Sequence, residues 1–154
     1  MPNTLRDAER SFGQGWHRTV KTIVIATGNK HKLEEYLELM PGFKLASMAD
    51  FSPMEEVDEN ALTFEGNACL KALAGFRHTN QLTLADDSGI EVEALDWAPG
   101  IKSARYVVGS DTDRLEALLA AMEGEENRRA RFTCAIAIAG LDVESTRQRL
   151  GNPT

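Results

Sequence analysis

A loop between an apolar run and the start of a helical pattern holds several groups that can bind phosphate. The stretch "TGNKHK", Thr27 to Lys32, follows the β-branched run "IVIA". Free backbone N–H groups and the helix dipole favour an anion at such a turn, and Gly28 allows close approach of the backbone. Asn29 adds a side-chain donor beside Thr27, while Lys30 and Lys32 can neutralise a polyphosphate. The alternative is ordinary helix capping with solvated lysines, and the Walker A spacing is absent.

Carboxylates gather in two stretches that could hold a divalent cation. "ADDSG" places Asp86 and Asp87 directly after the apolar run "LTLA", and α/β domains place their sites at strand ends. Mg²⁺ typically takes one or two carboxylates together with substrate phosphates. An ordinary Asp-Ser-Gly turn is the alternative. The run "EEVDE" at 55–59 supplies four more acids, of which Glu55 and Glu56 are expected to be solvated.

A third stretch, "APGIKSARY" at 98–106, follows a Pro-Gly turn signal. It contains Ser103, Arg105 and Tyr106, and Arg105 could meet a phosphate or a carboxylate. An ordinary strand or loop explains the stretch equally well.

Composition limits the classes of protein to which these residues can belong. The 154 residues suffice for one domain, and 42% hydrophobic with 27% charged residues is typical of a globular protein. The net charge of −7 argues against a nucleic-acid or membrane-surface binder, although an acidic protein can hold a local basic pocket. Cys69 and Cys134 are too few for a disulfide scaffold and are expected to be buried free thiols. A cytoplasmic location is expected because no secretory segment is present, with organelle targeting by the Arg-bearing residues 1–21 as the alternative.

The elements that must position these residues alternate between strands and helices, which predicts an α/β domain with a mixed sheet flanked by helices. Strands are expected over 22–26, 43–47, 82–86, 90–95 and 131–140, and helices over 30–40, 62–78 and 111–122. The strands "LTLAD" and "IEVEAL" would flank a tight "DDSG" turn and pair as antiparallel neighbours. The helix over 62–78 would bury Phe64, Ala68, Cys69, Ala72, Leu73 and Phe76, and Asp111 with Thr112 would cap the last helix. The domain would span 22–140, between an N-terminal extension over 1–21 and a polar tail over 141–154.

Three motifs stand in order along the chain: "ATGNKHK", "TFEGNACLKA" and "ADDSGIEVEAL…APGIKSARY". Together they resemble the inosine triphosphate pyrophosphatase family, also called dITP/XTP pyrophosphatases, from about Lys21 to Gly140. The resemblance implies Mg²⁺-dependent hydrolysis of ITP, dITP and XTP to the monophosphate and pyrophosphate. It also implies a homodimer with an elongated α/β fold and a cleft between two lobes. The related septum-inhibition type of nucleotide pyrophosphatase fits less well, because it would open with a Ser-x-Ser-x-x-Arg pattern.

The resemblance also implies roles for single residues. Asp87 matches the catalytic carboxylate, a proton acceptor near the metal, and Glu59 matches a metal-binding acid. The substrate-binding residues that it implies are Thr27, Gly28, Asn29, Lys30, His31, Lys32, Asn67, Lys71 and Ser88. A water would attack between the α and β phosphates, and the lysines of "TGNKHK" would stabilise the charge on the leaving pyrophosphate.

Two departures from the family pattern carry expectations of their own. Gly66 stands where the family commonly has an acid, in what we expect to be a helix interior. After Gly140 the chain has no "GGFGYDP"-like or "SHR"-like segment, so we expect a C-terminally truncated member that lacks the base-recognition half. We then expect weak base selectivity and an open sheet edge near 131–140. The alternative function is a non-catalytic nucleotide-binding remnant or a gene fragment.

Overall fold

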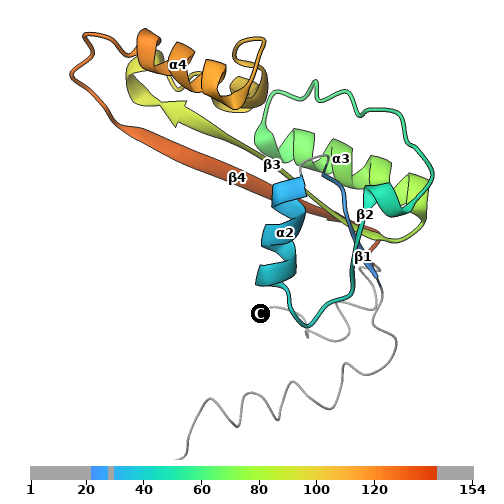
Figure 1. Cartoon of the computed structure of the whole chain (residues 1–154). Helices are drawn as coiled ribbons and strands as arrows, with labels where there is room; N and C mark the ends of the chain where they lie inside the picture. The colour runs from blue at the N-terminus through green and yellow to red at the C-terminus, as the bar shows by residue number, and fades with distance from the viewer. Residues whose placement is uncertain (1–21, 28–29, 142–154) are drawn as a thin grey trace, which may run out of the picture.

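A mixed four-stranded sheet forms the centre of the protein in the computed structural model, which describes residues 22–27 and 30–141 (Figure 1). The strand order is β2-β1-β3-β4. The strands are β1 (Ile23–Ile25), β2 (Leu45–Ser47), β3 (Leu82–Val92) and β4 (Ala130–Ala139). β1 runs parallel to both β2 and β3, and β4 runs antiparallel to β3. The predicted α/β class with a mixed sheet is confirmed.

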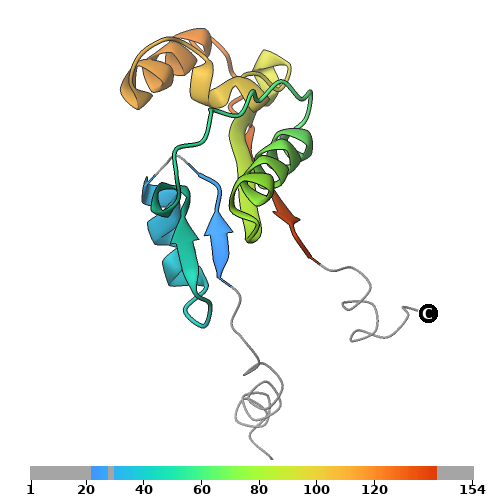
Figure 2. The same cartoon turned by 90° about the vertical axis from the view of Figure 1, so that its right-hand side faces the viewer.

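Two of the three α-helices lie on opposite faces of this sheet, and the third lies at the far end of the two long strands (Figure 1). They are α2 (Lys30–Leu39), α3 (Phe64–Thr79) and α4 (Asp111–Ala121), with a 3-10 helix over Gly100–Arg105. Side chains of α2 pack on Ile23, Ile25 and Leu84, whereas α3 packs on small residues that include Ala85 and Ala139. Because successive strand residues point to opposite faces, Leu84 and its neighbour Ala85 contact different helices. β3 and β4 form a long ribbon that extends beyond the short strands toward α4 (Figures 1 and 2).

The strand β3 is continuous through "DDSG", so the predicted tight turn and the predicted antiparallel pairing of its two halves are wrong. Asp86 pairs with Ile136, Asp87 with Ala135 and Ser88 with Cys134 in an unbroken ladder with β4. This long pairing overrides the weak intrinsic strand preference of Asp and Gly. Gly89 serves close packing instead of a turn, because a Cβ there would lie 2.4 Å from the carbonyl oxygen of Gly100.

The buried stripe of α3 differs from the predicted one. Phe64, Ala68 and Ala72 are buried as expected, together with Asn67 and Gly75. Cys69 and Leu73 are exposed, and so is Cys134 on β4, which makes the prediction of buried thiols wrong. Residues 64, 68, 72 and 75 form one line along the helix that faces the sheet. Cys69 and Leu73 each come one position after a residue of this line, so their side chains are rotated about 100° away from it.

Two local expectations near helix starts are also corrected. Ser110 caps α4 in place of the predicted Asp111 and Thr112, because its hydroxyl accepts the backbone N–H of Asp113 at 3.2 Å. Gly66 lies in the first turn of α3, where a Cβ would come within 2.6 Å of the Ala61 Cβ. Glycine is therefore required by close contact between this turn and the preceding loop.

The sheet ends in β4, which pairs with a strand on one side only within the described residues. This one-sided pairing confirms the expected open edge, and Phe132, Ile136 and Ile138 are exposed on the strand. The N-terminal extension over 1–21 and nearly all of the tail over 141–154 fall outside the described residues. Across the described part of the chain, no helix combines the length and apolar character that a membrane crossing requires.

Candidate active site

The two adjacent aspartates of β3 serve opposite faces of the sheet. Asp86 and Asp87 are both buried, and strand alternation directs their side chains apart. Asp86 faces α2 together with Ser88, two positions along the strand. Asp87 faces α3. The pair therefore belongs to two separate clusters of polar side chains.

The α2-side cluster holds Lys32 against the sheet. Its Nζ forms an ion pair with Asp86 Oδ2 and donates a hydrogen bond of 3.1 Å to Ser88 Oγ. The Asp86 side chain is only 5% exposed, so the ammonium provides charge compensation that a buried carboxylate requires. Burial and the negative charge of Asp86 raise the pKa of Tyr36, on the same face of α2, well above its ordinary value. Lys32, the last residue of "TGNKHK" and part of the first turn of α2, is thus held against β3.

The α3-side cluster fixes Asp87 through both of its oxygens. Asn67 is fully buried. Its Nδ2 donates a hydrogen bond of 3.0 Å to Asp87 Oδ2, and its Oδ1 accepts one of 3.0 Å from the backbone N–H of Ala61. Lys71 Nζ lies 3.5 Å from Asp87 Oδ1 and 3.3 Å from Glu59 Oε1. Carboxylates from a strand and from a loop are thereby brought to one ammonium group on α3.

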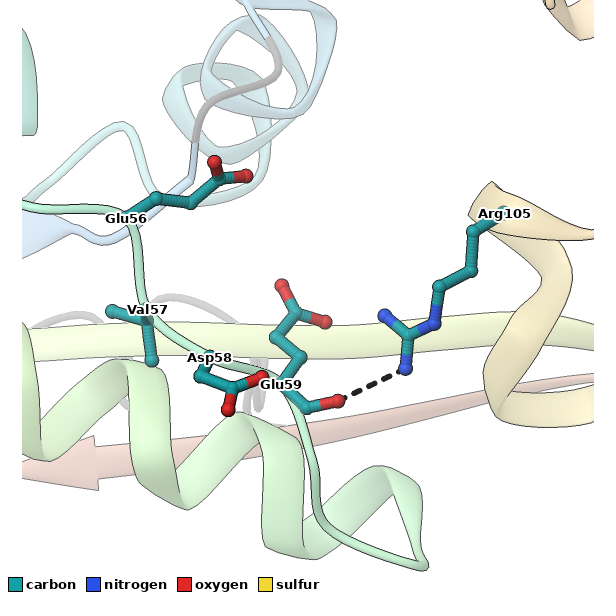
Figure 3. A pocket seen from close by; sticks show the side chains of 5 residues that line it. All are labelled: Glu56, Val57, Asp58, Glu59 and Arg105. Atoms are coloured by element: carbon teal, nitrogen blue, oxygen red, sulfur yellow. Dashed lines mark hydrogen bonds between the residues drawn. The ribbon is translucent and has the colours of Figure 1, made fainter. Parts of the chain in front are cut away.

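The acidic loop before α3 is anchored by an arginine that the sequence left ambiguous. Arg105 donates from Nη2 to the backbone oxygen of Glu59 at 2.9 Å (Figure 3). An open pocket of about 330 Å³ lies at this point. It is lined by Glu56, Val57, Asp58, Glu59 and Arg105. The carboxylates of Glu56 and Glu59 point to the same side of the loop, whereas Asp58 points away (Figure 3).

The charges of the two clusters decide what ligand they can accept. Three carboxylates, from Glu59, Asp86 and Asp87, are matched by two lysine ammonium groups, which leaves the clusters net negative. A polyphosphate would meet repulsion here unless a further cation accompanied it. Among the described residues no group of three or more His, Cys, Asp or Glu could hold a metal alone. The two carboxylates at Lys71 do fit Mg²⁺, which commonly takes one or two carboxylates and completes its shell with water and phosphate.

The predicted substrate residues are only partly placed by the structure. Gly28, Asn29 and the side chain of Lys30 lie outside the described residues. Thr27 ends the run after β1, and His31 lies on the exposed side of α2 with Nδ1 3.8 Å from Glu34 Oε2. The structure brings Lys32 to Ser88 on one face of the sheet. On the other it brings Asn67, Lys71, Glu59 and Asp87 together.

Sequence reasoning missed the role of Asp86 as the partner of Lys32. The available signal was the adjacency of the two aspartates, which separates their side chains to opposite faces if "DDSG" is a strand. Reading the stretch as a turn removed that signal. The catalytic and ligand roles of the individual residues stay predictions.

Comparisons with known proteins agree with the resemblance drawn from the motifs. A model of the Ham1 family matches residues 23–150. A dITP/XTP pyrophosphatase of Desulforamulus reducens is 46% identical over 123 residues, which cover 76% of this chain and 61% of the relative. One from Staphylococcus aureus (strain MW2) is 38% identical over 128 residues, covering 82% of this chain and 66% of the relative.

Solved structures give the same answer for the fold. The Staphylococcus aureus Ham1 protein superposes with a TM-score of 0.70 at 40% identity, over 79% of this chain and 65% of that one. A HAM1 protein from Coxiella burnetii gives a TM-score of 0.70 at 36% identity, over 77% of this chain and 62% of that one. The chain thus spans 61–66% of the length of the curated relatives described above. With a family model that matches most of its length, the chain belongs to the Ham1 family.

Proposed function

We propose that this chain is a nucleoside triphosphate pyrophosphatase that converts aberrant purine triphosphates (dITP, XTP and ITP) to the monophosphate and pyrophosphate. The names of the relatives as dITP/XTP pyrophosphatases support the substrate class. The observation that carries the proposal is the arrangement of Asp87, Glu59 and Lys71 on one face of β3, next to the Lys32 cluster on the other. Asp87 therefore offers a carboxylate for water on the α3 side of β3, and Lys32 of α2 offers a cation for phosphate on the other side.

Asp87 is the residue proposed to accept the proton of the attacking water. Asn67 holds its Oδ2, which leaves Oδ1 on the side of Lys71 and Glu59. The water oxygen forms a bond to phosphorus, the bridging P–O bond between the α and β phosphates breaks, and a water proton passes to Asp87. Pyrophosphate leaves with the electron pair of the broken bond. Asn67 orients the carboxylate through one oxygen, and the other, which Lys71 contacts at 3.5 Å, is the one proposed to accept the proton.

Lysine side chains supply the positive charge that the leaving pyrophosphate requires. We propose that Lys32 contacts the phosphates from the α2 side, with the backbone of the "TGNKHK" loop and Lys30 beside it. Its contacts with Asp86 and Ser88 orient the ammonium before substrate arrives. Such pre-oriented charge stabilises a transition state more than a mobile side chain does. Thr27 and His31 are proposed to complete the substrate contacts of this loop.

We further propose that Mg²⁺ is the cofactor, held by Glu59 and Asp87. The support is that both carboxylates already share one cation, Lys71, and that the two clusters are net negative without a further cation. When bound, Mg²⁺ would neutralise phosphate charge and polarise the phosphorus under attack. The resemblance also underlies our proposal of a homodimer, and the composition underlies that of a cytoplasmic location.

The reaction class is tested by identifying products as well as rates. Purified chain is incubated with Mg²⁺ and dITP, XTP, ITP, ATP or GTP, and monophosphate, diphosphate, phosphate and pyrophosphate are separated. The proposal expects monophosphate and pyrophosphate in equal amounts. Diphosphate with orthophosphate would point to a different phosphohydrolase, and binding of dITP without any product would favour a nucleotide-binding role. Glu91→Gln is the control variant, because it removes a carboxylate of β3 that lies outside the candidate site, where Glu91 pairs with Arg131. It should retain full turnover.

A further inference from the structure

The position of Lys71 between two acidic side chains has a consequence for how a cation enters. Its Nζ lies 3.3 Å from Glu59 Oε1 and 3.5 Å from Asp87 Oδ1. Charge-assisted N–H···O bonds usually measure about 2.7–2.9 Å, so neither contact is as short as a dedicated pair. One ammonium group is therefore shared loosely between two carboxylates.

Contacts other than Lys71 hold the Asp87 carboxylate and the backbone that carries Glu59. Asn67 fixes the second oxygen of Asp87, and Arg105 fixes the backbone of Glu59. If Lys71 moved away, the Asp87 carboxylate would remain in place, and the anchored backbone would keep the Glu59 carboxylate within reach of it. Two negative groups in that arrangement repel each other and require a cation.

We infer that Lys71 is an internal counter-ion that occupies the place of a divalent cation in the free protein and leaves the two carboxylates when that cation binds. This inference rests on the proposed function only in assigning Glu59 and Asp87 to the cation. The Lys71 side chain is 17% exposed, so after displacement its charge needs another anion close by. A substrate polyphosphate supplies one. Lys71 thereby favours entry of the divalent cation together with the polyphosphate over entry of the cation alone.

Lys32 offers a matched comparison for this role. It is also a partly buried lysine paired with a β3 aspartate, but it faces α2 and contacts Asp86 and Ser88. Removing it leaves Lys71 in contact with both Glu59 and Asp87. A general effect of losing one positive charge would appear in both lysine variants, whereas displacement of a counter-ion appears only at Lys71.

The test measures binding of Mn²⁺, a hard cation with the same preference for oxygen ligands, in the absence of nucleotide. Free Mn²⁺ is followed by electron paramagnetic resonance for the wild type, Lys71→Met, Lys71→Gln and Lys32→Met. We expect both Lys71 variants to bind Mn²⁺ about tenfold more tightly than the wild type, because a like charge within a few ångströms is removed. Lys32→Met should remain within about twofold. Thermal melting with Mn²⁺ should show the larger rise in the Lys71 variants.

The outcomes separate this inference from the proposed activity. Equal or weaker Mn²⁺ binding in both Lys71 variants would overturn the inference, as would a similar gain in Lys32→Met or no binding in any of the proteins. If Lys71→Met unfolds without Mn²⁺, the uncharged hydrogen-bonding glutamine variant decides. None of these measurements depends on turnover. If the Lys71 variants bind Mn²⁺ more tightly than the wild type but the wild type releases no pyrophosphate, the proposed function is refuted and the counter-ion role of Lys71 is supported.

Discussion

Asn67 provides the strongest single link between the fold and the candidate site. Its amide donates to Asp87 and accepts from the backbone N–H of Ala61, each at 3.0 Å, and the residue is fully buried. Asn67→Ala removes both bonds and leaves two polar groups without these partners. An unsatisfied buried group costs about 1–3 kcal/mol, and bonds to charged groups lie at the upper end. Because Asp87 and Ala61 each retain some contact with solvent, we expect a loss of about 2–4 kcal/mol in the free energy of unfolding.

Urea unfolding followed by far-ultraviolet circular dichroism measures this loss directly. Asn60→Ala is the matched control, because Asn60 donates to Asp58 at 3.0 Å in an exposed position. The control should change the free energy of unfolding by no more than about 0.5 kcal/mol, as exposed substitutions usually do. A loss below about 1 kcal/mol for Asn67→Ala, or one equal to the control, would refute the reasoning that this amide joins Asp87 to the loop.

Three further predictions follow from local contacts. Gly66→Ala should cost about 1–3 kcal/mol in urea unfolding, because its Cβ would meet the Ala61 Cβ at 2.6 Å, and an unchanged midpoint would show that the loop yields freely. Hydrogen bonds from Arg131 and Thr133 on β4 hold the pKa of Glu91 below its ordinary value. The ionised Glu91 therefore stabilises the fold at pH values above its ordinary pKa, and this stabilisation is lost as the pH falls through the lowered pKa of the folded protein. Melting from pH 7 to 3 should therefore show a smaller acid-side loss in Glu91→Gln than in wild type, and parallel curves would contradict this. Although Cys134 is exposed as a residue, partial desolvation of its thiol and the negative charge of Asp86 raise the thiol pKa. Asp86→Asn should therefore speed alkylation of Cys134 by iodoacetamide at pH 8, in a background with the other cysteine replaced by serine. A slower or unchanged rate would count against it.

Local sequence patterns were sufficient for the elements whose pattern and partners agree. The short apolar run at β1, followed by helix α2 from Lys30, appears as expected, and the sheet is mixed. β3 is the clearest failure, because Asp-Asp-Ser-Gly is a turn by local preference. Only its pairing with β4, more than forty residues later, makes it a strand. Interactions this distant in sequence leave no local trace from which they could be predicted.

The candidate site shows the same division between identity and geometry. Residue types and motif order were enough to select Lys32, Lys71, Asp87 and Glu59. They could not show that both lysines are already paired with carboxylates, because this depends on which face of β3 each aspartate takes. The anchoring of Glu59 by Arg105 depends on a contact across 46 positions. The exposure of Cys69 and Cys134 likewise follows from how α3 and β4 are turned against the sheet.

The central claim is that Asp87 activates water for cleavage between the α and β phosphates of an aberrant purine triphosphate. The most direct measurement is the rate of pyrophosphate release from dITP with Mg²⁺, compared between wild type and Asp87→Asn. Asparagine preserves the shape of the side chain and can still contact Asn67, but it cannot accept the proton. We expect pyrophosphate release by the wild type and a loss of at least about 100-fold in the variant, with dITP binding retained. Equal rates in the two proteins, whether both active or both zero, would contradict it.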